Sequence, residues 1–341
     1  MPPKVTLKDI AAAAGVTPMT VSRALRDSPK ISLPRRQQIQ ALALEMGYQP
    51  DPQISRLMSM LRTSRPHRGE TVIAVLSTLS QRGEFLTNPH QGAFYRGAET
   101  RARELGFKLE EFWVNEASMR LPRLQGVLAA RGIEALLLLP YGIGRRQLPL
   151  DYSRFAVAAI GRSQADQPFH RACQNHYRSV QIAIVECQKR GLRRIGMVLS
   201  DQLDARAGRR YSASMLHHLH VSKPGERVPL LELTAWNATT FKRWHARHRP
   251  EAILTTSRVM RERFAACGLL APRDYSFVNL DLVETDDESS GVDQNYGLVG
   301  AAALDLLATQ INHNEHGLAA FPKTVLIDGF WRDGDSVRTA V

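Results

Sequence analysis

Residues 5–26, VTLKDIAAAAGVTPMTVSRALR, constrain the fold of this chain more than any other stretch. Apolar residues in its first half recur at helical spacing and share one face: Leu7, Ile10, Ala11 and Ala14. Thr6 is a good N-cap for this helix, and Gly15 can adopt the left-handed conformation that ends it. Thr17 can cap a second helix that begins at Pro18, where no helical amide partner is needed. The stretch therefore predicts two short helices joined by a tight turn.

The second helix has a buried side and an outward side. Val21, Ala24 and Leu25 pack it onto the first helix, which leaves an outward set: Met19, Thr20, Ser22, Arg23 and Arg26. This arrangement is typical of a helix-turn-helix, in which the N-terminal part of the second helix enters the major groove of DNA. The alternative is an ordinary helical hairpin whose arginines face water, since short helix pairs are common.

A third helix completes a small helical module. Ser32 can cap it, Ile39 and Met46 close the core, and Gly47 ends it. Lys30, Arg35 and Arg36 lie near its start, where cations oppose the helix dipole. This is tolerable if phosphate groups lie opposite them, and the alternative is that these charges face water. Prolines then break the helix, a short helical segment follows over 53–61, and residues 63–69 form a polar, basic linker.

The charge and the cysteines narrow the class of protein. A formal net charge of +12 over 341 residues makes a polyanionic partner plausible. Cys173, Cys187 and Cys267 form no CxxC pair, which argues against a disulfide framework and a clustered zinc site. The start, MPPKVTLKD, lacks the apolar run of a signal peptide, and no apolar stretch approaches the roughly 20 residues that span a bilayer. We therefore expect a cytoplasmic protein with no membrane contact and no cofactor.

From residue 71 the periodicity changes to alternating strands and helices. Strands are expected at 72–76, 107–114, 135–139 and 155–160, with helices over 91–105 and 119–130. A second set has helices at 179–189, 211–219, 239–248 and 259–267, and strands at 195–199, 228–233, 252–255 and 277–280. A long helix over 292–313 should return to the first lobe, where a strand at 325–327 completes the fold. The pattern predicts a two-lobed, doubly wound α/β domain similar to periplasmic sugar-binding proteins, with a ligand cleft between the lobes.

The sequence resembles the lactose-repressor (LacI/GalR) family of bacterial transcription regulators. The matching words are VTLKDIAAAAGV, TVSRAL and MGYQPD near the N-terminus, with a looser LD at 280–281 and VDQN at 292–295. The resemblance implies a helix-turn-helix DNA-binding domain over 1–50, a hinge helix and linker over 51–69, and an effector-binding and dimerisation domain over 70–341. The family's Asn-x-x-Ala-Arg hinge pattern is replaced here by DPQIS at 51–55.

The resemblance also implies DNA contacts. Pro18, Met19 and Arg23 would read bases, because Arg suits guanine and an apolar side chain can touch a thymine methyl. Leu57 would be the hinge wedge that enters the minor groove and kinks the DNA. The complete expected DNA-binding set is Thr6, Leu7, Thr17, Pro18, Met19, Thr20, Ser22, Arg23, Arg26, Lys30, Ser32, Leu57 and Met58.

Effector contacts are expected where strands end, because open α/β sheets bind ligands at the carboxyl ends of their strands. The expected set is Ser77, Phe85, Tyr141, Arg206, Arg209, Thr256 and Asp281. The resemblance implies an arginine in the region of 206–210, an aspartate near 281, and an asparagine at the position where Thr256 stands. The aspartate corresponds to Asp281, whereas Arg206, Arg209 and Arg210 all remain possible for the arginine.

Together these features predict a dimeric regulator of transcription, a repressor, that binds palindromic operator DNA and responds to a sugar or a related effector. A solute-binding protein would carry a signal sequence and no basic helical module. An α/β enzyme would need a catalytic constellation. Here Gly142-x-Gly144 lacks the third glycine of a dinucleotide fingerprint, and no GxSxG occurs. The clustered His217, His218 and His220 fit a surface helix end better than a metal site.

Overall fold

The computed structural model describes residues 5–25, 31–48, 71–79, 81–114, 121–140, 148–163, 166–283 and 288–338. Five expected contact residues lie outside these ranges: Arg26, Lys30, Tyr141, Leu57 and Met58. The expected hinge and linker at 51–69 lie outside them as well.

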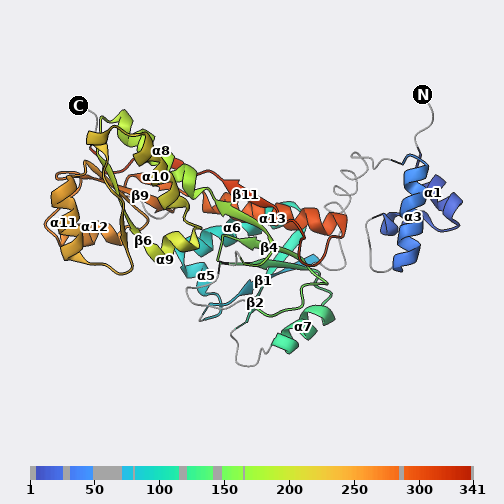
Figure 1. Cartoon of the computed structure of the whole chain (residues 1–341). Helices are drawn as coiled ribbons and strands as arrows, with labels where there is room; N and C mark the ends of the chain where they lie inside the picture. The colour runs from blue at the N-terminus through green and yellow to red at the C-terminus, as the bar shows by residue number, and fades with distance from the viewer. Residues whose placement is uncertain are drawn as a thin grey trace.

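Three short helices form the N-terminal module: α1 (Leu7–Ala14), α2 (Pro18–Ala24) and α3 (Leu33–Glu45) (Figure 1). Ile10, Val21 and Ile39, one from each helix, are fully buried against one another. Gly15 ends α1 with φ at 63°, as predicted. Along α3, Ile39 and Ala43 are buried in the core and Met46 packs against it as predicted, while Leu44 is 83% exposed.

The first lobe is a parallel six-stranded sheet in the order β11-β5-β4-β3-β1-β2. Its strands are β1 (Thr71–Ser77), β2 (Phe107–Trp113), β3 (Ala135–Leu138), β4 (Ala156–Ile160), β5 (His170–Gln174) and β11 (Thr324–Ile327). Alternate residues of β1 face opposite layers. Ile73 and Val75 pack with α6 (Pro89–Glu104) and α13 (Tyr296–His313), while Leu76 packs with α7 (Leu121–Ala130). The one-turn α5 (Glu84–Thr87) precedes α6.

The second lobe repeats this plan in a six-stranded sheet ordered β12-β10-β9-β8-β6-β7. Its strands are β6 (Ile195–Ser200), β7 (Leu231–Leu233), β8 (Ala252–Thr255), β9 (Ser276–Leu282), β10 (Gly291–Asp293) and β12 (Phe330–Arg332), the last antiparallel to β10. One face packs on α8 (His176–Lys189) and α10 (Arg210–Val221), and the other on α11 (Ala238–His248) and α12 (Val259–Ala265). The short α9 (Asp201–Arg206) and η1 (Pro224–Glu226) flank α10.

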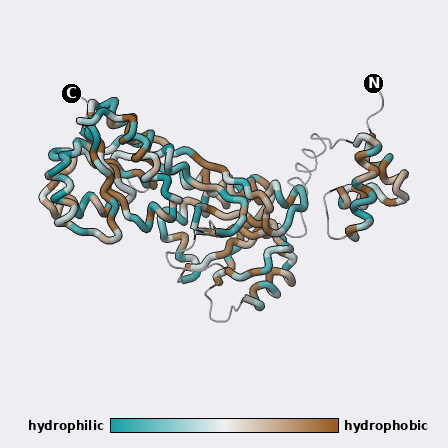
Figure 2. The backbone as a smooth tube through the Cα atoms, in the orientation of Figure 1, coloured by the Kyte–Doolittle hydropathy of each residue, from teal (hydrophilic) through white to brown (hydrophobic). Residues whose placement is uncertain are grey.

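The chain crosses between the lobes three times: from β5 to α8, from β10 to α13, and from β11 to β12. Figure 2 shows brown, hydrophobic stretches of the chain running through both lobes. Since α13 packs on α6 and four strands of the first sheet, its return to the first lobe is confirmed. The doubly wound, two-lobed prediction is also confirmed.

Several details differ from the sequence expectation. Residues 291–293 are the strand β10, so α13 begins only at Tyr296. Strand β7 covers Leu231–Leu233 rather than all of 228–233. Strands β5 and β12 were not predicted, because each is short and β5 mixes His170, Arg171 and Gln174 with its apolar residues.

Candidate nucleic-acid interface and effector cleft

The outer face of α2 carries the side chains expected to read DNA. Val21 and Ala24 are fully buried, whereas Met19 is 58% exposed and Arg23 is also exposed. Thr17 caps α2, because its hydroxyl oxygen accepts a hydrogen bond from the Thr20 amide at 3.2 Å. The helix therefore presents an arginine and a methionine outward from a fixed N-terminus.

The remaining expected contacts of the module divide into caps and partly buried groups. The Thr6 hydroxyl donates to the Asp9 carboxylate at 2.7 Å and the Thr6 amide donates to it at 2.8 Å. The hydroxyl bond and then the amide bond lower the pKa of Asp9, and both fix the start of α1. Leu7 is half-buried, and Ser22 lies beside the core residues of α2. Ser32 occupies the N-cap position of α3 without a side-chain capping bond, which corrects that expectation.

Two polar side chains of α3 hold the three helices together. Arg35 Nη2 donates to the Ala14 carbonyl at 2.8 Å, and Gln40 Nε2 donates to the Ala24 carbonyl at 3.0 Å. Both acceptors are carbonyls at helix C-termini, which lack helical donors and carry partial negative charge. Arg35 thus has an internal role, although its position near a helix start suggested a contact with phosphate.

Polar residues from both lobes meet where the sheets' carboxyl ends face each other. Tyr296, at the start of α13, donates a hydrogen bond to the carboxylate of Asp281 on β9. His90 Nε2, on α6 of the first lobe, lies 3.5 Å from the same carboxylate. Burial, followed by the charge of Asp281, raises the pKa of Tyr296 well above its usual value, so the phenol stays protonated and donates.

A second group lies beside this one. The rings of His176 and Tyr211 are 4.5 Å apart between centroids, which places the start of α8 against α10. The pKa of His176 is lowered to about 4, mainly by burial. The charges of Asp281 and Asp204 act to raise this pKa, whereas those of Arg210 and Arg162 act to lower it. His176 is therefore neutral at neutral pH, and its Nδ1 is buried without a hydrogen-bond partner in the described part of the chain.

Three arginines surround this second group. Arg162 follows β4, Arg171 lies within β5 at 4% exposure, and Arg210 is the first residue of α10. Burial, and then the like charge of Arg162, lowers the pKa of Arg210. The lobes touch here, because a Cβ built on Gly208 would lie 3.0 Å from Arg162 Nε.

The expected effector residues are only partly brought together. Asp281 lies in the centre of the cleft, and Ser77 ends β1 fully buried, its hydroxyl without a partner among the described residues. Thr256 follows β8 and is half-buried, and burial lowers the pKa of the Arg206 guanidinium. Phe85 is buried in the first lobe's core, with its ring 4.7 Å from that of Tyr95.

Arg209 and Arg210 are adjacent in the sequence, and the side chain of Arg209 points away from the cleft. Its guanidinium lies 2.6 Å from Asp201 and 3.6 Å from Glu232, on the outer side of β7. Arg209 has φ at 58°, a left-handed conformation that turns the chain immediately before α10 begins. Adjacent arginines therefore point to different surroundings, and Arg210 is the one next to Arg162 and His176.

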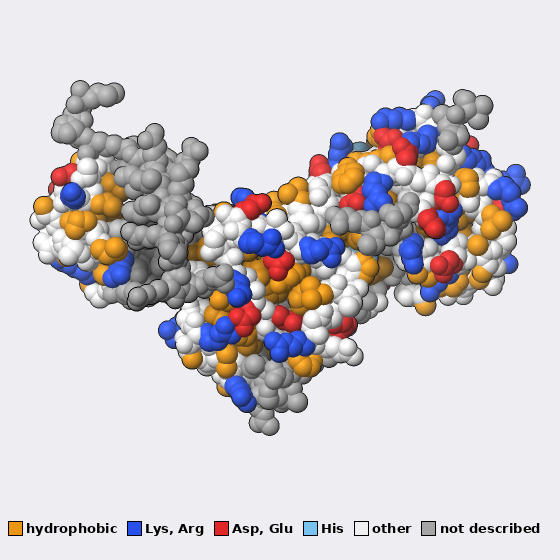
Figure 3. All heavy atoms as spheres, turned by 180° about the vertical axis from the view of Figure 1, so that it is seen from behind, with side chains coloured by type: hydrophobic (Ala, Val, Ile, Leu, Met, Phe, Trp, Pro, Cys, Tyr) orange, Lys and Arg blue, Asp and Glu red, His pale blue; other side chains and the backbone are white. Residues whose placement is uncertain are grey.

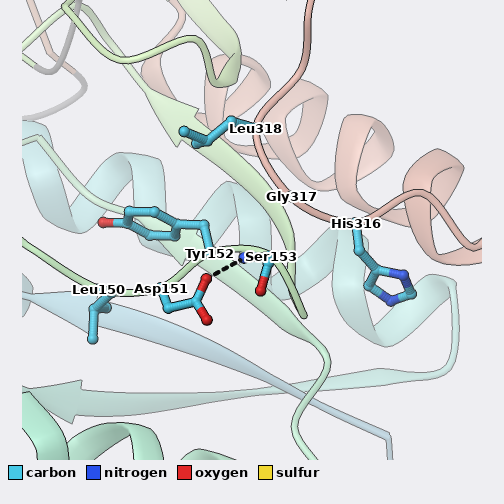
Figure 4. A pocket seen from close by; sticks show the side chains of 7 residues that line it. All are labelled: Leu150, Asp151, Tyr152, Ser153, His316, Gly317 and Leu318. Atoms are coloured by element: carbon cyan, nitrogen blue, oxygen red, sulfur yellow. Dashed lines mark hydrogen bonds between the residues drawn. The ribbon is translucent and has the colours of Figure 1, made fainter. Parts of the chain in front are cut away.

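A separate pocket of about 390 Å³ lies at the opposite edge of the first sheet (Figure 4). It is lined by Leu150, Asp151, Tyr152, Ser153, His316, Gly317 and Leu318. These residues precede β4 and follow α13, and Gly317 donates to the Phe155 carbonyl at 2.9 Å. Because this edge holds the amino ends of the strands, the pocket is distinct from the cleft.

Basic side chains are spread over both lobes as well as the helical module (Figure 3), so the net charge is not confined to the expected DNA-binding face. In the described ranges, no three His, Cys, Asp or Glu residues are grouped to hold a metal ion. None of the described helices is long and apolar enough to cross a membrane.

Comparison with known proteins begins with the helical module. The family model "Bacterial regulatory proteins, lacI family" matches residues 6–51, which include all three helices. Over these residues the chain is similar to the lacI family.

Curated relatives extend the match beyond the module. The HTH-type transcriptional regulator MalR of Streptococcus pneumoniae (serotype 4) is 23% identical over 329 residues, which cover 92% of this chain and 94% of MalR. The regulator DegA of Bacillus subtilis is 28% identical over 141 residues, and the match spans only 38% of DegA and 39% of this chain. Along nearly its whole length the chain is therefore similar to an HTH-type regulator of transcription.

Solved structures share the fold over nearly the whole length. A lac repressor dimer bound to operator and the anti-inducer ONPF has a TM-score of 0.54 at 17% identity, with 98% of this chain and 99% of that chain covered. A complex of the transcriptional regulator CelR with cellobiose has a TM-score of 0.54 at 18% identity, covering 98% of this chain and 100% of that chain. The lacI-family fold of a helical module and two parallel-sheet lobes is thus shared.

Sequence reasoning missed much of the cleft. Arg162 lies two residues beyond β4, so the same rule that selected Ser77 and Asp281 would have found it. His176 was missed because β5, the strand before it, was not predicted. Tyr211 and Tyr296 lie at helix starts, and periodicity alone cannot separate such residues from core aromatics.

Proposed function

We propose that this chain is a homodimeric repressor whose affinity for a palindromic operator is adjusted by a small molecule bound between the two lobes. The observation that carries the DNA-binding part is the outer face of α2, where Met19 and Arg23 are exposed over buried Val21 and Ala24. A guanidinium that projects from a major-groove helix can donate two hydrogen bonds to guanine O6 and N7.

The DNA contacts divide into three roles. Pro18, Met19 and Arg23 read bases, and Thr20, Ser22 and Arg26 bind phosphates. Leu57 and Met58 contact the minor groove. The remaining proposed DNA contacts are Thr6, Leu7, Thr17, Lys30 and Ser32. Residues 1–50, 51–69 and 70–341 form the DNA-binding, hinge and effector-binding parts. The match to a family model over 6–51 supports the first of these boundaries.

The cleft is the proposed effector site. Its support is the meeting of Asp281, Tyr296 and His90, which come from β9, α13 and α6 and therefore from both lobes. A ligand at such a boundary changes the relative free energies of lobe arrangements. The solved complex of CelR with cellobiose supports a sugar or a sugar derivative as the effector class. Ser77, Arg206 and Thr256 complete the proposed site, together with Arg210 in place of Arg209.

Selection from random duplex oligonucleotides with the purified chain tests the proposal. The expected result is enrichment of a palindrome that the protein binds at least about a thousandfold more tightly than random DNA at moderate salt. A ligand-dependent melting screen over sugars and sugar derivatives should then identify compounds that raise Tm and change operator affinity in a gel shift. Failure to enrich any sequence would remove the DNA-recognition part of the proposal.

A further inference from the structure

The arginines of the cleft lie where the two lobes touch. Arg162 follows β4 of the first lobe, and Gly208 of the second lobe packs against its guanidinium. A Cβ added to Gly208 would lie 3.0 Å from Arg162 Nε and 3.3 Å from its Nη2. The Arg162 Nε is buried and has no hydrogen-bond partner among the described residues. Because a buried donor without a partner costs free energy, this geometry indicates a missing acceptor.

Two more guanidinium groups lie beside Arg162. Arg171 is 4% exposed, and its Nη2 donates to the Gln167 carbonyl at 2.6 Å. For both Arg171 and Arg210 burial lowers the pKa most, and the like charge of Arg162 lowers it further. Three cations thus share a partly desolvated region at the junction of β4, β5 and α10.

Of the acidic groups nearby, Asp166 is exposed and its charge acts on Arg171, while the other two carboxylates are engaged elsewhere. Asp204 is fully buried and accepts from the Ser212 hydroxyl at 2.5 Å and the Tyr211 amide at 3.2 Å, so it fixes the start of α10. Asp281 accepts from Tyr296 and lies 3.5 Å from His90. His176 is neutral at neutral pH. An excess of positive charge therefore remains in the cleft.

We infer that the effector of this chain is an anion, an inference that rests on the proposed effector site. The anion is a small metabolite whose carboxylate or phosphate group binds between Arg162, Arg171 and Arg210. Planar guanidinium groups form paired hydrogen bonds with either group, and a buried anion would relieve the repulsion among the three cations. The Asp281 carboxylate can accept hydrogen bonds beyond the one from Tyr296, so it can also bind a hydroxyl group of the same molecule.

The test uses the full chain with defined probes. Sodium phosphate, sodium gluconate, glucose 6-phosphate and glucose are compared at ionic strength matched with sodium chloride, with Tm and calorimetric Kd as readouts. We expect at least one anion to raise Tm where glucose does not. The phosphate and gluconate arms separate the two sources of negative charge. Preference for neutral glucose, or no anion-specific rise in Tm, would overturn the inference.

Variants separate the cleft from the DNA-binding face, which could also attract anions. Arg162→Met should weaken binding of the active anion at least tenfold and cancel its effect on Tm, and Arg162→Lys should retain part of it. The matched control Arg273→Met removes an exposed arginine paired with Asp274 in the second lobe, and should leave anion binding unchanged. Equal losses in R162M and R273M would refute a cleft site.

The two proposals fail differently. If neutral sugars alter operator affinity and anions do not, the regulator with a cleft effector stands and the anionic class is wrong. If an anion binds in an Arg162-dependent way without changing operator affinity, the anion site stands and the effector role is wrong.

Discussion

Arg23 and Arg35 belong to the same helical module, but one side chain is exposed and the other is hydrogen-bonded inside the module. Arg23 lies exposed on α2, while Arg35 donates to the Ala14 carbonyl at 2.8 Å and to Gln38 at 2.6 Å. A side chain bonded inside the fold contributes to stability, whereas one directed outward is available for a partner. The two residues should therefore respond oppositely in measurements of folding and of DNA binding.

Arg23→Ala should weaken operator binding by about 1–3 kcal/mol and relax the preference at one base pair, with Tm unchanged. Arg35→Ala should instead lower the free energy of unfolding by about 1–2 kcal/mol, because a charge-assisted hydrogen bond to a helix end is lost. Fluorescence anisotropy on operator and random DNA, together with urea unfolding, checks both. An equal loss on both DNAs for R23A would contradict a base-reading role.

His176 gives a prediction on pH. Its pKa is about 4 in the fold against 6.5 for an unperturbed histidine, mainly through burial, so the unfolded chain binds more protons between these values. Stability is therefore fully present above pH 6.5 and falls as the pH drops towards 4. His176→Phe keeps a ring against Tyr211 and should reduce that loss by about 1–3 kcal/mol.

Urea unfolding of both proteins between pH 7 and 4.5 measures this difference. Other histidines with lowered pKa values are common to wild type and variant, so they cancel in the comparison: His170, His218, His245 and His248. Parallel stability curves for wild type and H176F would contradict the assignment.

At the level of elements, the closest backbone approach joins α6 to α13. A Cβ on Gly300 would lie 2.0 Å from the Phe94 carbonyl oxygen, and one on Gly97 would lie 1.9 Å from that of Gly297. Only glycine permits this separation, which seats the long helix on the first lobe although β10, just before it, belongs to the second. The pair thus fixes one of the three crossings.

Gly300→Ala should destabilise the chain by about 1–3 kcal/mol, because the helices must move apart to admit the methyl group. Gly126→Ala is the matched control on α7, where nothing lies within 4 Å of the added Cβ, and it should stabilise by roughly 0.5–1 kcal/mol through helix propensity. Thermal unfolding measured by circular dichroism compares the two. Similar Tm values for both variants would argue against a tight contact between α6 and α13.

At the level of the whole molecule, three crossings between two lobes allow small changes in their relative orientation. A ligand that favours one orientation can change operator affinity only by its difference in affinity for the two states, typically about 1–3 kcal/mol. One helix-turn-helix reads half of a palindrome, so two copies related by a twofold axis are required.

Light scattering should therefore give about twice the 38.1 kDa chain mass, on and off a palindromic duplex. Saturating effector should change operator affinity by a factor of roughly 5–150 in a titrated gel shift. A monomer under both conditions, with operator affinity indifferent to a cleft-bound ligand, would contradict the proposed assembly and its regulation.

The sequence by itself determined the helical module and the layered α/β plan. Their signals are local: a cap at Thr17, a left-handed Gly15, and apolar runs that match single strands. Tertiary structure alone decided the cleft, where Arg162, His176 and Arg210 approach one another from separate segments in two lobes. It also decided between Arg209 and Arg210, because a positive φ at Arg209 directs one guanidinium to Asp201 and leaves the next beside Arg162. The hydrophobic periodicity of a sequence predicts which face of a helix or strand is buried. It does not predict which side chains, distant in the sequence, come into contact between the two sheets.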